Sequence, residues 1–307
     1  MGPMDENPIQ ARLEELAADR VSGAREIVAR LLNLLHERLP ELPAEEARRF
    51  ILQAARAIVP RQPTMAPLLF TFNQLFRHAE EDGGLVAVLE DLRRRHHEAL
   101  DHVVRTARPL LEGVRGVAIL SWSSTVNRVL EGMAESCRVF VAESRPGCEG
   151  RRAAVRAAAA GHRVVFHPDA AFPGAAAEAE LLLLGGDALT STALINKVGS
   201  LPAAREFQSR GAKVVALVDA FKVIDEGLAE RLRILPENPA EVWEGAPEGV
   251  EVSCRYFEAV PVSLLDQVWS EDGARDPQDL FTTATTDALS PLWREVPLPA
   301  EGEPIAV

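Results

Sequence analysis

The chain has 307 residues, 47% hydrophobic and 26% charged, which is ordinary for a folded protein with a substantial core. Its apolar runs fall short of the roughly 20 residues that a membrane span needs, and its first residues lack the pattern of a signal peptide. With three cysteines and no CxxC pair, the chain is expected in a reducing cytoplasm.

The net charge of −13 is unevenly distributed along the chain. Residues 1–222 hold 28 basic and 28 acidic side chains, whereas residues 223–307 hold 5 basic and 18 acidic ones, which accounts for the whole excess. An acidic C-terminal part argues against direct nucleic-acid binding, which depends on neutralising phosphates. It is either a solvated face or a surface for a partner protein.

Residues 9–112 are predicted to be helical throughout. Apolar side chains recur every three to four positions in residues 27–35, and residues 44–58 and 84–111 supply further amphipathic segments. His97 and His102 lack the i, i+4 spacing of a helical zinc pair, so no metal site is predicted.

The pattern changes near Gly113, where short apolar runs begin to alternate with helical segments. Strands are predicted at 117–120, 138–142, 163–166, 180–184 and 214–218, with helices at 126–133, 151–160 and 203–210 between them. Such alternation indicates an α/β fold with a doubly wound parallel sheet. Residues 251–254 and 260–265 are candidates for edge structure. The chain therefore divides into a helical domain (1–112), a sheet domain (113–275) and a tail or poorly ordered wrap (276–307).

The fourth predicted strand ends in chemically useful residues. Four consecutive leucines, 181–184, suit a strand covered on both faces, and two glycines then lead to Asp187. Asn196 and Lys197 are expected on the following loop. Polar groups at the carboxyl ends of parallel strands lie where open α/β sheets bind ligands. The alternative is an ordinary strand and turn with a solvated aspartate.

Two further strand ends favour a phosphate pocket. Ser123, Ser124 and Thr125 lie at a predicted helix start, where hydroxyls cap the helix and free backbone N–H groups attract phosphate. Arg145 adds a guanidinium beside glycines that permit close backbone approach. The alternatives are capping without a ligand and a tight turn with surface arginines.

Lysine placement points the same way. The chain has only three lysines, and Lys197 and Lys222 both fall at strand ends. The sequence has no G-x-G-x-x-G after the first strand, no phosphate-binding GxxxxGK[ST] and no G-x-S-x-G, so no nucleotide cofactor is predicted.

Several of these segments, in this order, resemble one protein family. They are Ala118–Thr125, Val139–Gly150, Leu182–Asp187, Asn196–Gly199 and Lys222, flanked by Asp19–Ala24 near the start and by Tyr256, Phe257, Pro261 and Ser270–Gly273 near the end. The resemblance is to the family that joins the alpha, beta and delta regulatory subunits of translation initiation factor two-B with the isomerases of ribose 1,5-bisphosphate and methylthioribose 1-phosphate. It spans roughly residues 10–275.

The resemblance implies a helical N-terminal domain and a Rossmann-like domain that forms a homodimer or higher homo-oligomer, with a phosphosugar pocket between the domains. In the isomerases, a cysteine and an aspartate move protons between neighbouring sugar carbons, and Asp187 matches that aspartate. The ligand-contacting positions of the family match residues of this chain, namely Gly23, Ser124, Thr125, Asn127, Asn196, Lys197 and Lys222.

The chain departs from the isomerase pattern at the cysteine, whose position falls on Ser123. A hydroxyl is far less acidic than a thiol with a pKa near 8.5, and losing a matched acid–base group costs about 10²–10⁴-fold in rate. Cys148 is a possible substitute. Glu149 stands where isomerases usually carry glutamine, and the interval from Asp187 to Asn196 is about one residue short. These departures favour the non-catalytic branch.

The leading hypothesis is a regulatory or catalytically weakened protein that binds a phosphorylated ribose, either a sugar phosphate or a nucleoside monophosphate. Its pocket residues are expected to be Ser123, Thr125, Arg145, Asp187, Asn196, Lys197 and Lys222. The second is an active aldose–ketose isomerase in which Asp187 and Ser123, Cys148 or water transfer protons. The third is a structural subunit that binds partner proteins through its acidic C-terminal surface.

Overall fold

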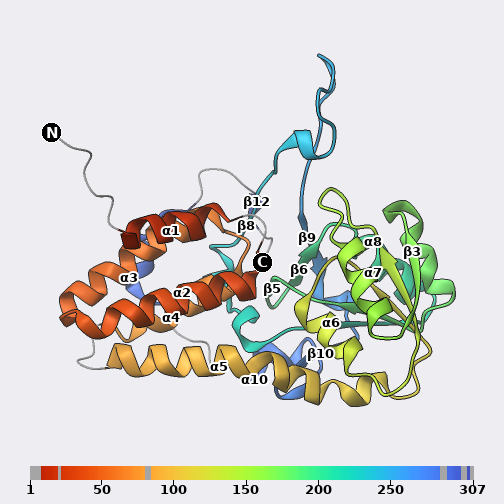
Figure 1. The fold of residues 1–307 in the computed structure, drawn as a ribbon, viewed down its shortest axis with the longest axis horizontal. Helices are drawn as coiled ribbons and strands as arrows, with labels where there is room; N and C mark the ends of the chain where they lie inside the picture. Colours follow the sequence, from red (N-terminus) through yellow and green to blue (C-terminus); the bar gives the residue numbers. More distant parts are fainter. Residues whose placement is uncertain (1–7, 20–21, 80–83, 284–288, 299–302, 305–307) are drawn as a thin grey trace.

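The computed structural model describes residues 8–19, 22–79, 84–283, 289–298 and 303–304. The N-terminal part is helical, as predicted, and Figure 1 shows its helices packed side by side. They are α1 (Pro8–Ala18), α2 (Ala24–Arg38), α3 (Ala44–Ile58), α4 (Ala66–Arg77) and α5 (Gly84–Thr106), with short 3₁₀ turns at Leu39–Glu41, Val59–Arg61 and Arg108–Leu111. The long α5 runs beneath the other helices and reaches the sheet, where it contacts β10.

A seven-stranded sheet with the order β11-β10-β7-β4-β1-β2-β3 forms the second part. Every neighbouring pair is parallel except β10 and β11 at one edge. The strands are β1 (Gly116–Ile119), β2 (Arg138–Ala142), β3 (Arg163–His167), β4 (Leu181–Leu184), β7 (Lys213–Leu217), β10 (Gln267–Ser270) and β11 (Gly273–Arg275). The predicted fold, a mostly parallel α/β sheet preceded by a helical region, is confirmed.

The four leucines of β4 serve both faces of this sheet. Leu182 and Leu184 pack with residues of α8 (Ser200–Ser209), whereas Leu181 and Leu183 pack on the opposite face with residues of α6 (Ser124–Glu131) and α7 (Gly150–Ala159). Because side chains alternate along a strand, a strand covered on both faces must be apolar at every position.

A second, smaller sheet joins the two parts. It contains β5 (Ala188–Leu189), β6 (Ala193–Lys197) and β9 (Phe257–Pro261), all antiparallel. Ala188 and Ile195 pack into the core of the helical part, and Leu189 and Leu194 pack into the core of the large sheet. The prediction that Asn196 and Lys197 lie on a loop was wrong. They form the end of β6, which continuous pairing with β9 holds in place.

Residues 235–256 form an extended segment, here called the arm, that projects from the top of the molecule in Figure 1. Its regular structure is one short 3₁₀ turn at Pro239–Glu241, and residues 251–254, expected as edge structure, are not in a strand. The strand in this region is β9, and residues 267–270 and 273–275 add β10 and β11.

Within residues 276–307, expected as a tail, α10 (Asp279–Thr283) is followed by a buried 3₁₀ turn, Pro291–Glu295. Trp293 is fully buried and its ring lies edge-on to Phe76, with 5.1 Å between ring centroids. Asn73 Oδ1 accepts a hydrogen bond of 3.0 Å from Trp293 Nε1. This turn therefore belongs to the core of the helical part. Among the described residues, no helix combines the length and apolar character needed to cross a membrane.

Candidate functional site

A cavity of about 1170 Å³ lies between the helical part and the carboxyl ends of the large sheet's strands. The helical part contributes Asp19, residues 22–26, Ala29, Leu32, Asn33, residues 61–65, Arg93, His96 and His97 to its wall. The sheet side contributes side chains that follow β1, β4 and β7, the end of β6 and the base of the arm. This is the position at which doubly wound sheets bind ligands.

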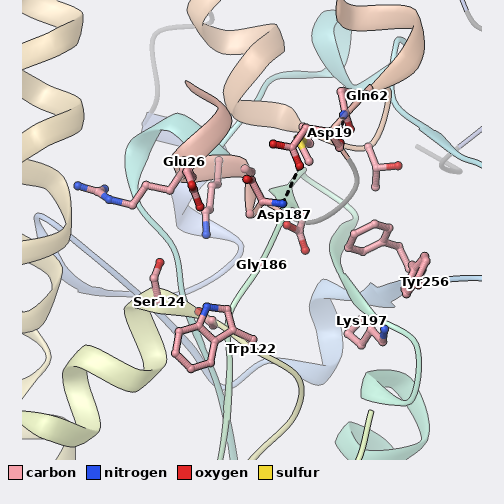
Figure 2. A pocket seen from close by; sticks show the side chains of 18 of the residues that line it. Asp19, Glu26, Gln62, Trp122, Ser124, Gly186, Asp187, Lys197 and Tyr256 are labelled. Atoms are coloured by element: carbon pink, nitrogen blue, oxygen red, sulfur yellow. Dashed lines mark hydrogen bonds between the residues drawn. The ribbon is translucent and has the colours of Figure 1, made fainter. Parts of the chain in front are cut away.

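Asp187 lies in the middle of the wall drawn in Figure 2, with Ser124 and Trp122 on one side and Lys197 and Tyr256 on the other. The glycines before it permit close packing, since a Cβ on Gly186 would stand 2.6 Å from Leu194. Burial raises the pKa of Asp187, and the ammonium groups of Lys222 and Lys197 offset part of that rise. Asp187 is thus a carboxyl group poised to hold a proton closer to neutral pH than usual.

Lys222 places a buried ammonium group in the wall of the cavity. It follows β7 in a short 3₁₀ turn (Ala220–Lys222), lines the cavity and is only 8% exposed. Within the described part of the chain its ammonium has no hydrogen bond or ion pair, although its charge acts on Asp187. A buried cation without a partner is costly, so this ammonium is suited to meeting an anion in the cavity.

Ser123 lines the same cavity but is already engaged as the N-cap of α6. Its Oγ accepts a hydrogen bond of 3.3 Å from the backbone N–H of Val126, and its carbonyl accepts one from Asn127 N at 3.0 Å. The backbone N–H groups of Ser124 and Thr125 have no acceptor within the helix, because the first turn of a helix lacks them. Among the described residues, no side chain that could act as a base is hydrogen-bonded to Ser123.

Lys197, predicted as a free cation, is paired within the protein. Its ammonium donates to Glu149 Oε1 at 2.9 Å and lies 4.2 Å from the centre of the Tyr256 ring. The Lys197 side chain is 4% exposed and that of Glu149 is 32% exposed. Burial lowers the pKa of Lys197, and the Glu149 carboxylate opposes that change.

Asn196 and Gly23 also line the cavity, as predicted. Asn196 is held by a hydrogen bond from its amide to Ser200 Oγ at 3.0 Å, and Ser200 in turn donates to the Lys197 carbonyl at 2.6 Å. Gly23 precedes α2, and a Cβ there would meet nothing within 4 Å, so the backbone is open to the cavity. Arg20, part of the same predicted segment, lies outside the described residues.

Four of the predicted or considered residues do not line the cavity. Thr125 and Asn127 are buried in α6, and the Asn127 amide donates to the Ser123 carbonyl at 2.7 Å. Arg145 is exposed and its guanidinium reaches the Val242 carbonyl at 3.4 Å, so it braces the arm. Cys148 lies beside Arg145, its thiol donating to the Pro146 carbonyl at 3.6 Å. Arg145 and Cys148 therefore lie outside the cavity wall, contrary to the pocket predicted for Arg145. Gly147 and Glu149 of the same loop do line the cavity.

Sequence reasoning missed Arg25 and His96, which come from the helical part. Arg25 lines the cavity and donates to the carbonyls of His96 at 2.6 Å and His97 at 3.2 Å, joining α2 to α5. His96 packs edge-on against Phe221 beside Lys222. Burial, reinforced by the Arg25 charge, lowers the pKa of His96 to about 4. The signal available was the position of Arg25 directly after the Gly23-Ala24 segment.

The cavity wall carries both signs of charge. Its cations are Arg25, Arg61, Arg93, Lys197 and Lys222, and its carboxylates are Asp19, Glu26, Glu149, Asp187, Glu237 and Glu241. Such a wall suits a ligand with both an anionic group and hydrogen-bonding groups, rather than a polyanion. The described residues contain no cluster of three or more side chains that could hold a metal ion.

The sequence of this chain is similar to those of a known protein family. Residues 20–277 match the Initiation factor 2 subunit family. The chain is 21% identical to the ribose 1,5-bisphosphate isomerase of Pyrococcus furiosus over 304 residues, covering 90% of this chain and 93% of the relative.

Solved structures share the fold. The translation initiation factor eIF-2B of Pyrococcus horikoshii OT3 superposes with a TM-score of 0.76 at 18% identity, covering 89% of this chain and 98% of that one. The 5-methylthioribose 1-phosphate isomerase of Pyrococcus horikoshii OT3 gives a TM-score of 0.69 at 19% identity, covering 90% and 88%. At such identities the likeness concerns the fold, so the activity must be argued from the cavity.

Proposed function

The chain belongs to the Initiation factor 2 subunit family, and on that premise we propose that its cavity binds a phosphorylated ribose, either a sugar phosphate or a nucleoside monophosphate. We further propose that the protein is a regulatory or catalytically weakened member of the sugar-phosphate isomerase superfamily. Relatives named ribose 1,5-bisphosphate isomerase support the ligand class.

One observation carries the proposal: the buried Lys222 ammonium, which has no ion pair among the described residues, shares a cavity with Asp187 and with the N-terminus of α6. A phosphate would be held by the ammonium and by free backbone N–H groups, which point outward at a helix start. Ribose hydroxyls would then lie near the carboxylate and amide of Asp187 and Asn196. Ser123 caps α6, and no base among the described residues is hydrogen-bonded to it, which supports weak or absent catalysis.

Isothermal titration calorimetry tests this function with ribose 5-phosphate, ribose 1,5-bisphosphate and nucleoside 5′-monophosphates. We expect binding of at least one of them, and Lys222→Met should weaken it by about 10- to 100-fold, because a charge-assisted contact worth about 1.5–3 kcal/mol is lost. Lys213→Met is the matched control, since Lys213 is exposed at the opposite end of the same strand. No heat from any compound with folded protein would rule the function out.

A second candidate is an active aldose–ketose isomerase, which the raised pKa of Asp187 favours. An acid–base group works best when its pKa lies near the working pH. Turnover in heavy water should then incorporate solvent deuterium into the product, and Asp187→Asn should abolish it. Turnover that survives this substitution unchanged excludes the mechanism.

We also propose that the protein forms a homodimer or higher homo-oligomer, in the cytoplasm, where its three free cysteines stay reduced. Exposed large apolar side chains support an interface. Val242 (42%) and Trp243 (52%) lie on the acidic arm, whereas Val155 (71%) and Phe166 (44%) lie on α7 and β3 among arginines. Opposite charges around two apolar patches suit contact between two copies of the chain.

A further inference from the structure

The part of the cavity around Lys197 and Tyr256, here called the Lys197 end, contains carboxylates as well as the lysine. The Glu149 carboxylate contacts the ammonium directly, and its second oxygen, Oε2, is buried with no hydrogen-bond partner among the residues that the structure describes. The arm adds the carboxylate of Glu241, which accepts a hydrogen bond from the Tyr256 hydroxyl. At this end the Lys197 ammonium is therefore flanked by two carboxylates, Glu149 directly and Glu241 through the Tyr256 side chain.

The electrostatics of neighbouring groups support this description. Burial raises the pKa of Tyr256, and the hydrogen bond to Glu241 and the charge of Glu149 raise it further. Burial also raises the pKa of Cys254, with the carboxylates of Glu241 and Glu237 adding to the effect. Burial, with a further contribution from nearby carboxylates, raises the pKa of both groups, and those carboxylates would also repel a phosphate.

The Ser124 side of the cavity differs in how its cation is held, although the Glu26 carboxylate also lines this side. Lys222 has no ion pair within the described residues, and the first turn of α6 at Ser124 offers backbone N–H groups. Figure 2 shows Ser124 and Lys197 on opposite sides of Asp187, so the two ends are separate places for a ligand. A cavity of about 1170 Å³ is large enough for a ligand that reaches both.

We propose that Glu149 is a specificity-determining residue: by engaging Lys197 it closes that end of the cavity to a phosphate. The ligand then carries its phosphate only at the Lys222 end and presents hydroxyl or amino groups to Glu149 and Tyr256. This inference rests on the proposed function and refines it, because it separates singly phosphorylated ribose compounds from the bisphosphate. Glu149 is part of the wall, so its charge acts on the ligand itself rather than through the fold.

Calorimetry with ribose 5-phosphate and ribose 1,5-bisphosphate, at one ionic strength, tests the inference on the wild-type protein and on Glu149→Gln. Glutamine keeps an acceptor for Lys197 but removes the negative charge. The matched control is Glu143→Gln, which makes the same change on the same loop, where Glu143 pairs with Arg151 outside the cavity. Thermal unfolding verifies that each variant is folded, and Glu149→Ala replaces the glutamine variant if that one does not fold.

The wild-type protein should bind the monophosphate at least as tightly as the bisphosphate. Glu149→Gln should bind the bisphosphate about tenfold more tightly than the wild type does and raise the ratio of bisphosphate to monophosphate affinity, while Glu143→Gln should match the wild type in both. A strong wild-type preference for the bisphosphate, or an equal gain in both Gln variants, or no gain in Glu149→Gln, overturns the inference alone. Absence of binding by both compounds in every variant overturns the inference, and if the nucleoside 5′-monophosphates also fail to bind, it overturns the proposed function as well.

Discussion

Ser123 and Gly185 are in such close contact that no side chain fits between them. A Cβ on residue 185 would stand 2.6 Å from Ser123 Oγ and 2.8 Å from Ser123 Cβ. This contact fixes the N-cap of α6 against the carboxyl end of β4, two residues before Asp187. The glycine pair that follows the leucines therefore sets the distance between the two strand ends that form the cavity.

Gly185→Ala should destabilise the protein and weaken ligand binding together. The added methyl group displaces Ser123, and overpacking of this kind costs about 1–3 kcal/mol. Denaturant unfolding and calorimetry measure the two effects. Gly174→Ala is the control, because a Cβ at that exposed glycine would meet nothing within 4 Å and should leave both quantities unchanged. An unaffected Gly185→Ala variant would contradict the proposed tight contact.

Ser123→Cys should increase isomerase turnover with ribose 5-phosphate by about 10²-fold or more, since a thiol at a helix N-terminus ionises far more readily than a hydroxyl. Product formation by chromatography measures it. Ser123→Ala should show no gain and should lose about 1 kcal/mol of stability with the N-cap. If the cysteine and alanine variants turn over equally slowly, the missing thiol is not what limits catalysis.

The large sheet was predictable because its signals are local. Strand β2 was predicted at its observed bounds, and the four leucines of β4 indicated burial on both faces before Asp187. Strand β6 was missed because it pairs with β9, 60 or more positions later in the chain. Its stability comes from that distant partner, which no local pattern reports.

The cavity was predicted in part for the same reason. Strand ends in a parallel sheet converge at one edge, so Ser123, Asp187 and Lys222 could be grouped from their positions alone. The ion pair of Lys197 with Glu149 joins residues 48 positions apart and depends on side-chain reach. Arg145, like Glu149, precedes α7, but its side chain faces the arm. That direction follows from the geometry of the loop rather than from the residue type.

Asp187→Asn should raise the melting temperature relative to the wild type at neutral pH. The native pKa of Asp187 is raised above its unfolded value of about 3.9, so the native state binds more protons and stability falls as pH rises through that window. Asparagine cannot ionise and avoids this loss. The advantage should be small at pH 4 and grow toward pH 7.5 in thermal unfolding, whereas exposed Asp101→Asn should show no such trend.

His96 should make the protein sensitive to mild acid. Its native pKa, lowered to about 4, lies below the unfolded value near 6.5, so the unfolded state binds more protons in between. Stability should therefore fall by about 3 kcal/mol as pH decreases from 6.5 to 4. Urea unfolding of His96→Gln should show a smaller acid loss than the wild type. The control is the exposed neighbour His97, since His97→Gln should lose as much stability in acid as the wild type does. Equal acid losses in both variants would contradict the assignment.

The arm and the α7–β3 surface (Arg152, Val155, Arg163 and Phe166) should contact each other between copies of the chain. Glu244 and Glu248 on the arm, like Arg152 and Arg163, have no ion pair on their own chain within the described residues, so each set can form ion pairs with a partner, with the Arg152 guanidinium held 3.7 Å from the centre of the Trp122 ring. Light scattering should give about twice the chain mass of 33.4 kDa for the wild type.

Reversing the charges tests that contact directly. One variant carries Glu244→Lys with Glu248→Lys, the other Arg152→Glu with Arg163→Glu, and each alone should dissociate toward the monomer because like charges now face each other. An equimolar mixture should recover the dimer, since in a mixed pair both contacts again join opposite charges. Reciprocity of this kind is expected only when the same two patches meet twice across a two-fold axis. A mixture that stays monomeric, or variants that remain dimeric alone, would exclude this pair of surfaces as the interface.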